Sequence, residues 1–89
     1  MAFVYTDLSL FARSGKNALW HYRTNDVATV VDTRDYFLTV INEMNLGDFI
    51  LANVDLDGTP GYGFYCVTEN DGTNIDVNNI LAITGTDSD

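Results

Sequence analysis

The fold is decided by residues 32–77, whose sequence is DTRDYFLTVINEMNLGDFILANVDLDGTPGYGFYCVTENDGTNIDV. Within this stretch, residues 33–44 place apolar side chains at i, i+3, i+4 and i+7, which is the spacing of one helical face. These side chains are Phe37, Val40, Ile41 and Met44. Asp32 can accept hydrogen bonds from the first turn, and Gly47 can adopt the left-handed conformation just past the last. The sequence therefore predicts one short amphipathic helix.

Strand-like runs follow the helix directly. Residues 48–54 and 62–68 are rich in β-branched and aromatic side chains, which suit a pleated, half-buried surface. The linker at residues 55–61 is longer than a two-residue hairpin turn, so it predicts two antiparallel strands joined by a wide, exposed loop. Residues 70–73 (NDGT) predict a tighter turn into another strand at residues 74–77.

Another strand is predicted upstream of the helix, at residues 18–23. Its alternation divides two sets of side chains, Ala18, Trp20 and Tyr22 on one face and Leu19, His21 and Arg23 on the other. Residues 27–31 form a short β-branched segment between this strand and the helix. Residues 1–11 mix apolar and polar side chains without a clean period, which favours an arm that packs on the domain or on a neighbour.

These patterns together predict one domain in an 89-residue chain. We divide it into an arm and loop at residues 1–17, a core at residues 18–83 and an acidic, frayed tail at residues 84–89. The expected fold class is mostly β (α+β), a small antiparallel sheet or barrel with one short amphipathic helix packed across it. A domain of this size buries only roughly 60–65% of its unfolded surface, so it is marginal alone.

The charge of the chain is acidic and unevenly distributed. Four basic and three acidic residues give the first 34 positions a net charge of +1, and ten acidic residues without a base give the remainder −10. Direct nucleic-acid binding is not expected, because phosphate contacts need clustered Lys and Arg. No apolar run is long enough for a membrane span and no signal peptide is visible, which favours synthesis in a cytosol.

Few side chains could perform chemistry. His21 and Cys66 are single residues of their kind, too few for a zinc site of four Cys or His ligands within one chain. Cys66 lies in an apolar run and is interpreted as a small core residue. The segment Asp55-x-Asp57-Gly58 resembles the start of a calcium loop, but Cys66 stands where the twelfth-position Glu belongs. We therefore expect no metal, no cofactor and no enzymatic activity.

The aromatic residues remain as candidates for binding. Five Phe, five Tyr and one Trp exceed what so small a core holds, which favours an oligomer or a partner. We expect the less regular N-terminal third to supply the partner-facing side chains. The predicted interface residues are Phe3, Val4, Tyr5, Leu8, Phe11, Arg13, Lys16, Trp20 and His21.

A family resemblance is carried by residue order along nearly the whole chain. It rests on LWHYRT at residues 19–24, VDT at 31–33 with Tyr36-Phe37, LGD at 46–48, VT at 67–68, IDV at 75–77 and the ending GTDSD at 85–89. In this order the chain resembles small virion structural proteins of tailed bacteriophages and gene transfer agents. Some of these decorate the head, and others form the base of a head spike or fibre.

The resemblance implies a non-enzymatic virion protein, made in the host cytoplasm and built into the particle. Its implied partner is the major capsid protein or another virion protein, and its implied state is a homotrimer. Two alternatives come from other classes of protein. One is a receptor- or carbohydrate-binding fibre tip that stacks sugars on exposed Trp20, Tyr22 or Tyr62. The other is a small hydrolase that uses paired aspartates such as Asp55 and Asp57.

Overall fold

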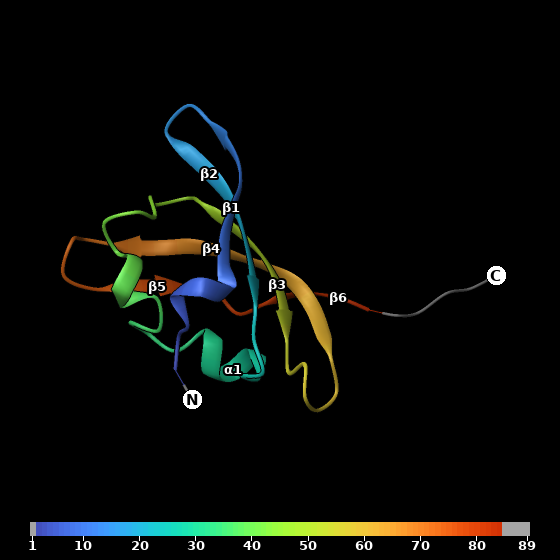
Figure 1. Cartoon of the computed structure of the whole chain (residues 1–89). Coiled ribbons are helices and arrows are strands. Elements are labelled where there is room, and N and C mark those ends of the chain that lie inside the picture. Colours follow the sequence, from blue (N-terminus) through green and yellow to red (C-terminus); the bar gives the residue numbers. More distant parts are fainter. Residues whose placement is uncertain (1, 85–89) are drawn as a thin grey trace.

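Six strands form one mixed sheet in the computed structural model, which describes residues 2–84 (Figure 1). The strands are β1 Leu8–Ser14, β2 Asn17–Arg23, β3 Phe49–Val54, β4 Gly61–Asn70, β5 Ile75–Val77 and β6 Leu81–Ile83. The helical elements are short: the 3₁₀ helices η1 Tyr5–Asp7 and η2 Leu38–Val40, and the α-helix α1 Ala28–Val31. The predicted mostly β, α+β class is confirmed.

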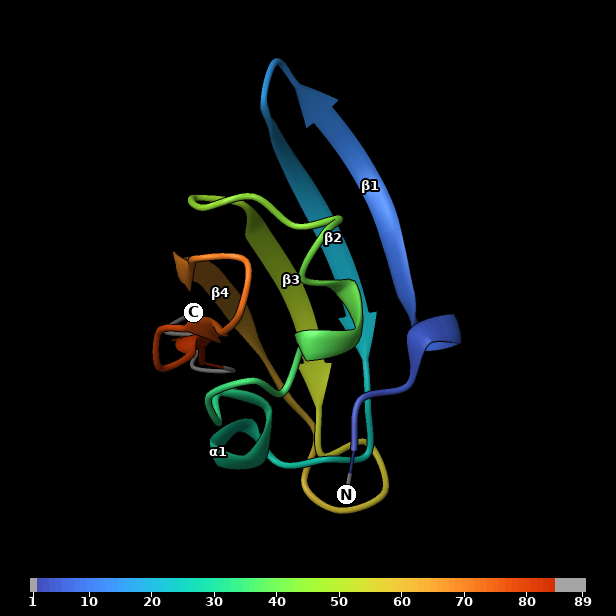
Figure 2. The same ribbon diagram turned by 90° about the vertical axis from the view of Figure 1, so that its left-hand side faces the viewer.

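The strand order is β1-β2-β3-β4-β5, and β6 pairs with β4, as β5 does. β1 and β2 form an antiparallel hairpin, as do β3 and β4, whereas β2 and β3 are parallel, with Leu19 opposite Phe49. The sheet is therefore mixed, not antiparallel as predicted. Parallel neighbours need a long crossover, and residues 24–48 supply it. Figure 2 shows this crossover over one face of the sheet.

The helix predicted for residues 33–44 is wrong, and Asp35 gives the physical reason. Its φ of 68° is left-handed, a conformation that an α-helix cannot contain. The Asp35 carboxylate accepts hydrogen bonds from the Ile75 N–H at 2.9 Å and the Asn74 side chain at 2.7 Å. The Asp35 N–H in turn donates to the Ile75 carbonyl at 2.7 Å. These three hydrogen bonds to the β4–β5 region hold Asp35 in the left-handed conformation, so the chain does not continue as a helix.

The crossover divides into α1, a series of turns and η2 instead. α1 Ala28–Val31 falls within residues 27–31, the short β-branched segment that precedes the predicted helix. Asp32 lies at the C-terminal end of α1 and not at the start of a helix. Gly47 has a φ of 90°, so its predicted left-handed conformation is confirmed.

The core lies between the crossover and one face of the sheet. Three apolar residues of the predicted helical face, Phe37, Val40 and Met44, are buried there, although no continuous helix carries them. The predicted alternation of β2 is confirmed as well, because Ala18, Trp20 and Tyr22 share its buried face. The sheet contributes Ala18, Trp20, Tyr22, Ile50, Ala52, Val54, Tyr65, Val67, Ile75 and Val77, and α1 contributes Val31.

The N-terminal segment is more regular than the predicted arm. Residues 8–14 form strand β1, and a bulge between Leu10 and Ala12 interrupts its alternation, which hides the strand from a period-two pattern. Phe3 packs on the core, its ring centroid 5.3 Å from that of Tyr22. The loop predicted at residues 13–17 reduces to a turn at Gly15, where φ is +62°. Of the predicted tail, residues 85–89 lie outside the described residues.

Candidate functional site

A buried carboxylate fixes the part of the sheet on which the candidate site is built. Asp48 is fully buried and accepts four hydrogen bonds of 3.0–3.1 Å. The donors are Asn17 Nδ2, the backbone N–H groups of Ala18 and Asn45, and Trp20 Nε1. Burial by itself raises the pKa of Asp48, but these hydrogen bonds outweigh it, so the pKa lies below its ordinary value.

The Asp48 network joins the start of β2 to the end of the crossover. It locks the indole of Trp20 in place, and the indole is only 6% exposed. Asn45 is held from both sides, because its backbone N–H donates to Asp48 and its side chain donates to the Lys16 carbonyl at 2.8 Å. The positions of Trp20 and Asn45 are therefore set by buried charge and hydrogen bonds.

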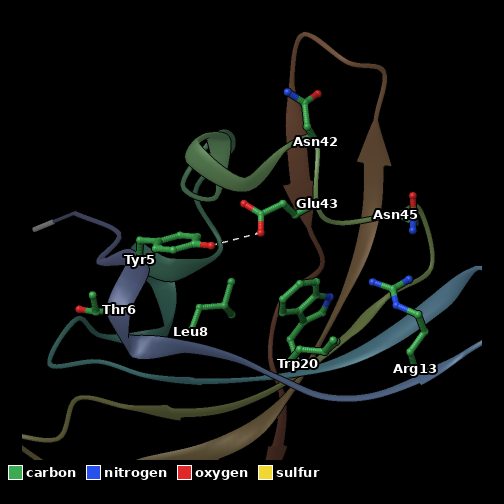
Figure 3. Close-up of a pocket in the computed structure, with 9 residues that line it drawn as sticks. Tyr5, Thr6, Leu8, Arg13, Trp20, Asn42, Glu43 and Asn45 are labelled. Atoms are coloured by element: carbon green, nitrogen blue, oxygen red, sulfur yellow. Dashed lines mark hydrogen bonds between the residues drawn. The ribbon is translucent and has the colours of Figure 1, made fainter.

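A surface hollow of about 690 Å³ opens above Trp20, between β1 and the crossover. In Figure 3, Trp20 and Leu8 form its floor, and a hydrogen bond of 3.3 Å from the Tyr5 hydroxyl to Glu43 closes one side. Arg13 and Asn45 stand on the other side (Figure 3). The full lining is Tyr5, Thr6, Leu8, Leu10, Arg13, Trp20, Asn42, Glu43 and Asn45.

Four of the nine predicted interface residues meet in this hollow, namely Tyr5, Leu8, Arg13 and Trp20. Sequence reasoning missed Leu10. Its spacing of two residues from Leu8 is typical of one strand face and could have identified it. Sequence reasoning also missed the crossover residues Asn42, Glu43 and Asn45. The position of these three residues depends on the path of residues 32–48, and no local sequence pattern predicts that path.

The other predicted interface residues are dispersed. Phe3 belongs to the aromatic cluster of the core, and the Val4 N–H donates to the Tyr22 hydroxyl at 3.1 Å. Phe11 is 67% exposed on β1, and Lys16 lies exposed at the hairpin turn. His21 lies on the opposite face of the sheet, where its Nε2 is 2.8 Å from Asn53 Oδ1.

The stacking surface predicted for a fibre tip is mostly buried. Trp20 and Tyr22 point into the core, so their predicted exposure is wrong. Their alternation in β2 gives the reason, because it places both on the face that the crossover covers. Tyr62 is about half exposed and lies on the opposite face.

The β1–β2 hairpin carries uncompensated positive charge. It extends beyond the other strands (Figures 1 and 2), and its end bears exposed Arg13 and Lys16. Within residues 2–84, the ion pair present joins Arg34 to Glu69 at 2.8 Å, and neither hairpin cation has an acidic partner. The hydrogen bond and charge of Glu69 raise the pKa of Arg34.

The aspartates of the β3–β4 loop act in turn formation. Asp55 has a φ of 53°, and its carboxylate accepts a hydrogen bond from the Thr59 N–H at 3.2 Å. Asp57 is exposed.

In the part of the chain that the structure describes, no cluster of three or more His, Cys, Asp or Glu residues could hold a metal ion. Over the same residues, no helix is long and apolar enough to cross a membrane.

The hollow and the hairpin above it therefore form the strongest candidate site on the covered side of the sheet. Comparison with other proteins adds no precedent for this arrangement. No protein-family model, no curated protein and no solved structure matches the chain.

Proposed function

We propose that this chain is a non-enzymatic structural protein of a bacteriophage virion, which binds the major capsid protein or another virion protein. Its role is to decorate or stabilise the capsid, or to form the base of a head spike or fibre. The binding element is the hairpin surface, defined here as Tyr5, Leu10, Phe11, Arg13 and Lys16. The observation that carries the proposal is the set of exposed apolar and basic side chains on this projecting hairpin and on η1, which leads into it.

The hairpin surface combines two features of a protein-binding patch. Tyr5, Leu10 and Phe11 are each more than half exposed, and aromatic side chains with Arg are enriched in interfaces. Arg13 and Lys16 supply positive charge on a chain with a net charge of −9. This charge favours an acidic surface on the partner.

β1 also offers backbone hydrogen bonds to a partner. It is the terminal strand of the sheet order, so its outer edge has no strand neighbour within residues 2–84. An extended segment of a partner could add to such an edge, with its side chains entering the hollow beside Trp20. The bulge at Phe11 interrupts the edge, which limits pairing with arbitrary strands.

On a particle, many copies bind a repeating lattice, so avidity makes a modest single contact sufficient. The resemblance in residue order supports a location in the virion after synthesis in the host cytoplasm. The homotrimer that the resemblance implies stays a prediction.

The test uses particles assembled without this chain, to which purified protein is added before sedimentation. The double variant Arg13→Glu/Lys16→Glu and the variant Phe11→Ser should each lower the affinity for particles at least tenfold. Matched controls are Arg23→Glu, an exposed cation at the far end of β2, and Val27→Ser, an exposed apolar residue before α1. Hairpin variants that co-sediment as well as the wild type, with unchanged circular dichroism, would refute the assignment.

The second candidate function is carbohydrate binding by a fibre tip, and the hollow favours it. Its volume of about 690 Å³ suits a small ligand. Exposed Tyr5 offers a ring for stacking, and Asn42, Glu43 and Asn45 offer polar groups that sugar hydroxyls can bind. A glycan array separates the candidates, since specific glycan binding lost in Tyr5→Ala and Glu43→Gln would favour the fibre tip.

A further inference from the structure

The central strands are apolar on both faces, although the crossover covers only one. β3 reads Phe-Ile-Leu-Ala-Asn-Val, and β4 contains Phe64-Tyr65-Cys66-Val67. Near-continuous apolar runs are typical of strands that are buried on both sides. In β3 the buried residues Ile50, Ala52 and Val54 face the crossover, and the residues between them face outward. The outward set needs a cover that residues 2–84 do not provide.

Strand register assembles these outward residues into three rows. Leu19 pairs with Phe49 and Phe49 with Cys66 in the first row. The second row runs through His21, Leu51, Phe64 and Leu81, and the third through Arg23, Asn53, Tyr62 and Ile83. We call this surface the open face. It comprises Leu19, His21, Arg23, Phe49, Leu51, Asn53, Tyr62, Phe64, Cys66, Leu81 and Ile83.

The exposed apolar area of the open face is large for an 89-residue chain. Phe49, Tyr62, Leu81 and Ile83 are 53%, 48%, 67% and 52% exposed. Large apolar side chains of about 200 Å² each give these four an exposed area of about 400 Å². The half-buried residues raise the patch to about 600 Å², the upper end of what monomers expose.

The open face also excludes negative charge. Of the 13 acidic residues in the chain, none of those within residues 2–84 belongs to the open face. Its two central polar side chains, His21 and Asn53, satisfy each other at 2.8 Å. A surface hollow of about 510 Å³ lies beside them and is lined by Leu51, Tyr62 and Ile83 among others. The one charged side chain of the face is Arg23, which is exposed at the end of the third row, and the remainder can be covered without burying a charge.

We propose that the open face is occupied by a second copy of this chain, so that two sheets pack face to face in a two-fold dimer. The acidic surfaces of two copies repel each other, whereas the open face carries no acidic residue within residues 2–84. Packing one open face on another covers both at once, as an isologous interface requires. Sheets that pack this way lie about 10 Å apart, with their side chains interdigitating.

The area of the open face indicates the size class of the dimer interface. About 600 Å² from each copy gives a total near 1,200 Å², the lower limit of standard protein interfaces. Small interfaces of this kind are typical of weak complexes, so we expect a reversible dimer with a Kd on the order of micromolar or weaker. This pairing goes beyond the proposed function because it uses the side of the sheet opposite to the hollow. Arg13 borders the open face, because it lines a hollow with Leu19 and Phe49, but Tyr5 and Leu10 lie on the opposite side and stay free in both copies.

Analytical ultracentrifugation of the purified chain from 1 to 300 μM tests the proposal. The mass should rise from one copy to two over this range. Leu81→Asp should weaken association at least tenfold. The matched control is Phe11→Asp, because Phe11 on the hairpin and Leu81 on the open face are both 67% exposed. A species that stays monomeric, a trimer, or equal weakening by both variants would overturn the proposal.

A measurement on the unmodified chain removes the dependence on variant folding. Cys66 is the sole cysteine and lies half-buried on the open face. Its rate of alkylation by a small reagent should fall several-fold as the protein concentration rises through the dimer range. A rate that does not depend on concentration would count against a second copy on this face.

Discussion

The substitution Asp48→Asn tests the hydrogen-bond network under Trp20. An amide of the same shape has one acceptor oxygen and one NH₂ group, so two of the four donors around Asp48 lose their acceptor. A hydrogen bond to a charged group contributes about 1.5–3 kcal/mol. With partial relaxation of the exposed Asn17 side chain, we expect a loss of about 3 kcal/mol in the free energy of unfolding at pH 7.

The pH dependence separates loss of the charge from loss of packing. The pKa of Asp48 is below its ordinary 3.8 in the folded chain, so the carboxylate stabilises the fold above that pH. This stabilisation disappears as the pH falls through the lower, folded pKa. The difference between wild type and Asp48→Asn should therefore be full at pH 7 and begin to shrink below about pH 4.

Urea unfolding provides the assay, because the fluorescence of Trp20, the single tryptophan, reports on the network directly. Circular dichroism serves as an independent probe of the same transition. The control is Asp57→Asn on the exposed β3–β4 loop, which should change stability by less than about 0.5 kcal/mol. A loss below about 1 kcal/mol for Asp48→Asn at pH 7 would refute the magnitude derived from the four bonds.

Two further substitutions test the packing. Gly63→Ala should destabilise the fold by about 1–3 kcal/mol in a thermal melt, because its Cβ would lie 2.5 Å from the Leu81 carbonyl oxygen. An unchanged melting temperature would contradict the observed β4–β6 contact. Tyr36→Phe removes a hydroxyl that donates to Asp26 at 2.6 Å and should cost about 1–3 kcal/mol in urea unfolding. Burial and the hydrogen bond to Asp26 raise the pKa of Tyr36 above its ordinary 10.0. The extra stability of the wild type over Tyr36→Phe should therefore decrease as the pH rises past 10. A difference in unfolding free energy that stays constant up to pH 11 would contradict this expectation.

The strands at residues 18–23, 49–54, 62–68 and 75–77 were predictable because their composition and alternation are local signals. The helix at residues 33–44 failed for a reason that is not local. The spacing of Phe37, Val40 and Met44 does match a buried face. The conformation of Asp35, however, is set by hydrogen bonds to Asn74 and Ile75, about forty positions away in sequence.

The candidate sites also combine features that local sequence patterns predict with features that depend on tertiary structure. The apolar residues Phe49, Leu51 and Phe64 are visible in the sequence, but the strand pattern does not show whether they are covered. Only the position of the crossover shows which side stays uncovered. The hollow above Trp20 depends on Asn42, Glu43 and Asn45, and their approach to β1 follows from the tertiary path of the crossover.

The parallel pairing of β2 with β3 has a consequence for the order of folding. The β1–β2 and β3–β4 hairpins each close over a short loop, whereas joining β2 to β3 must close the loop formed by residues 24–48. Closing that loop costs more chain entropy before any contact compensates it. We therefore expect both hairpins to form first and the transition state to lie at their docking, where Asp48 reaches the Ala18 N–H and the Trp20 indole. The same carboxylate that holds Trp20 in the finished fold would then set the rate at which the two halves of the sheet become one.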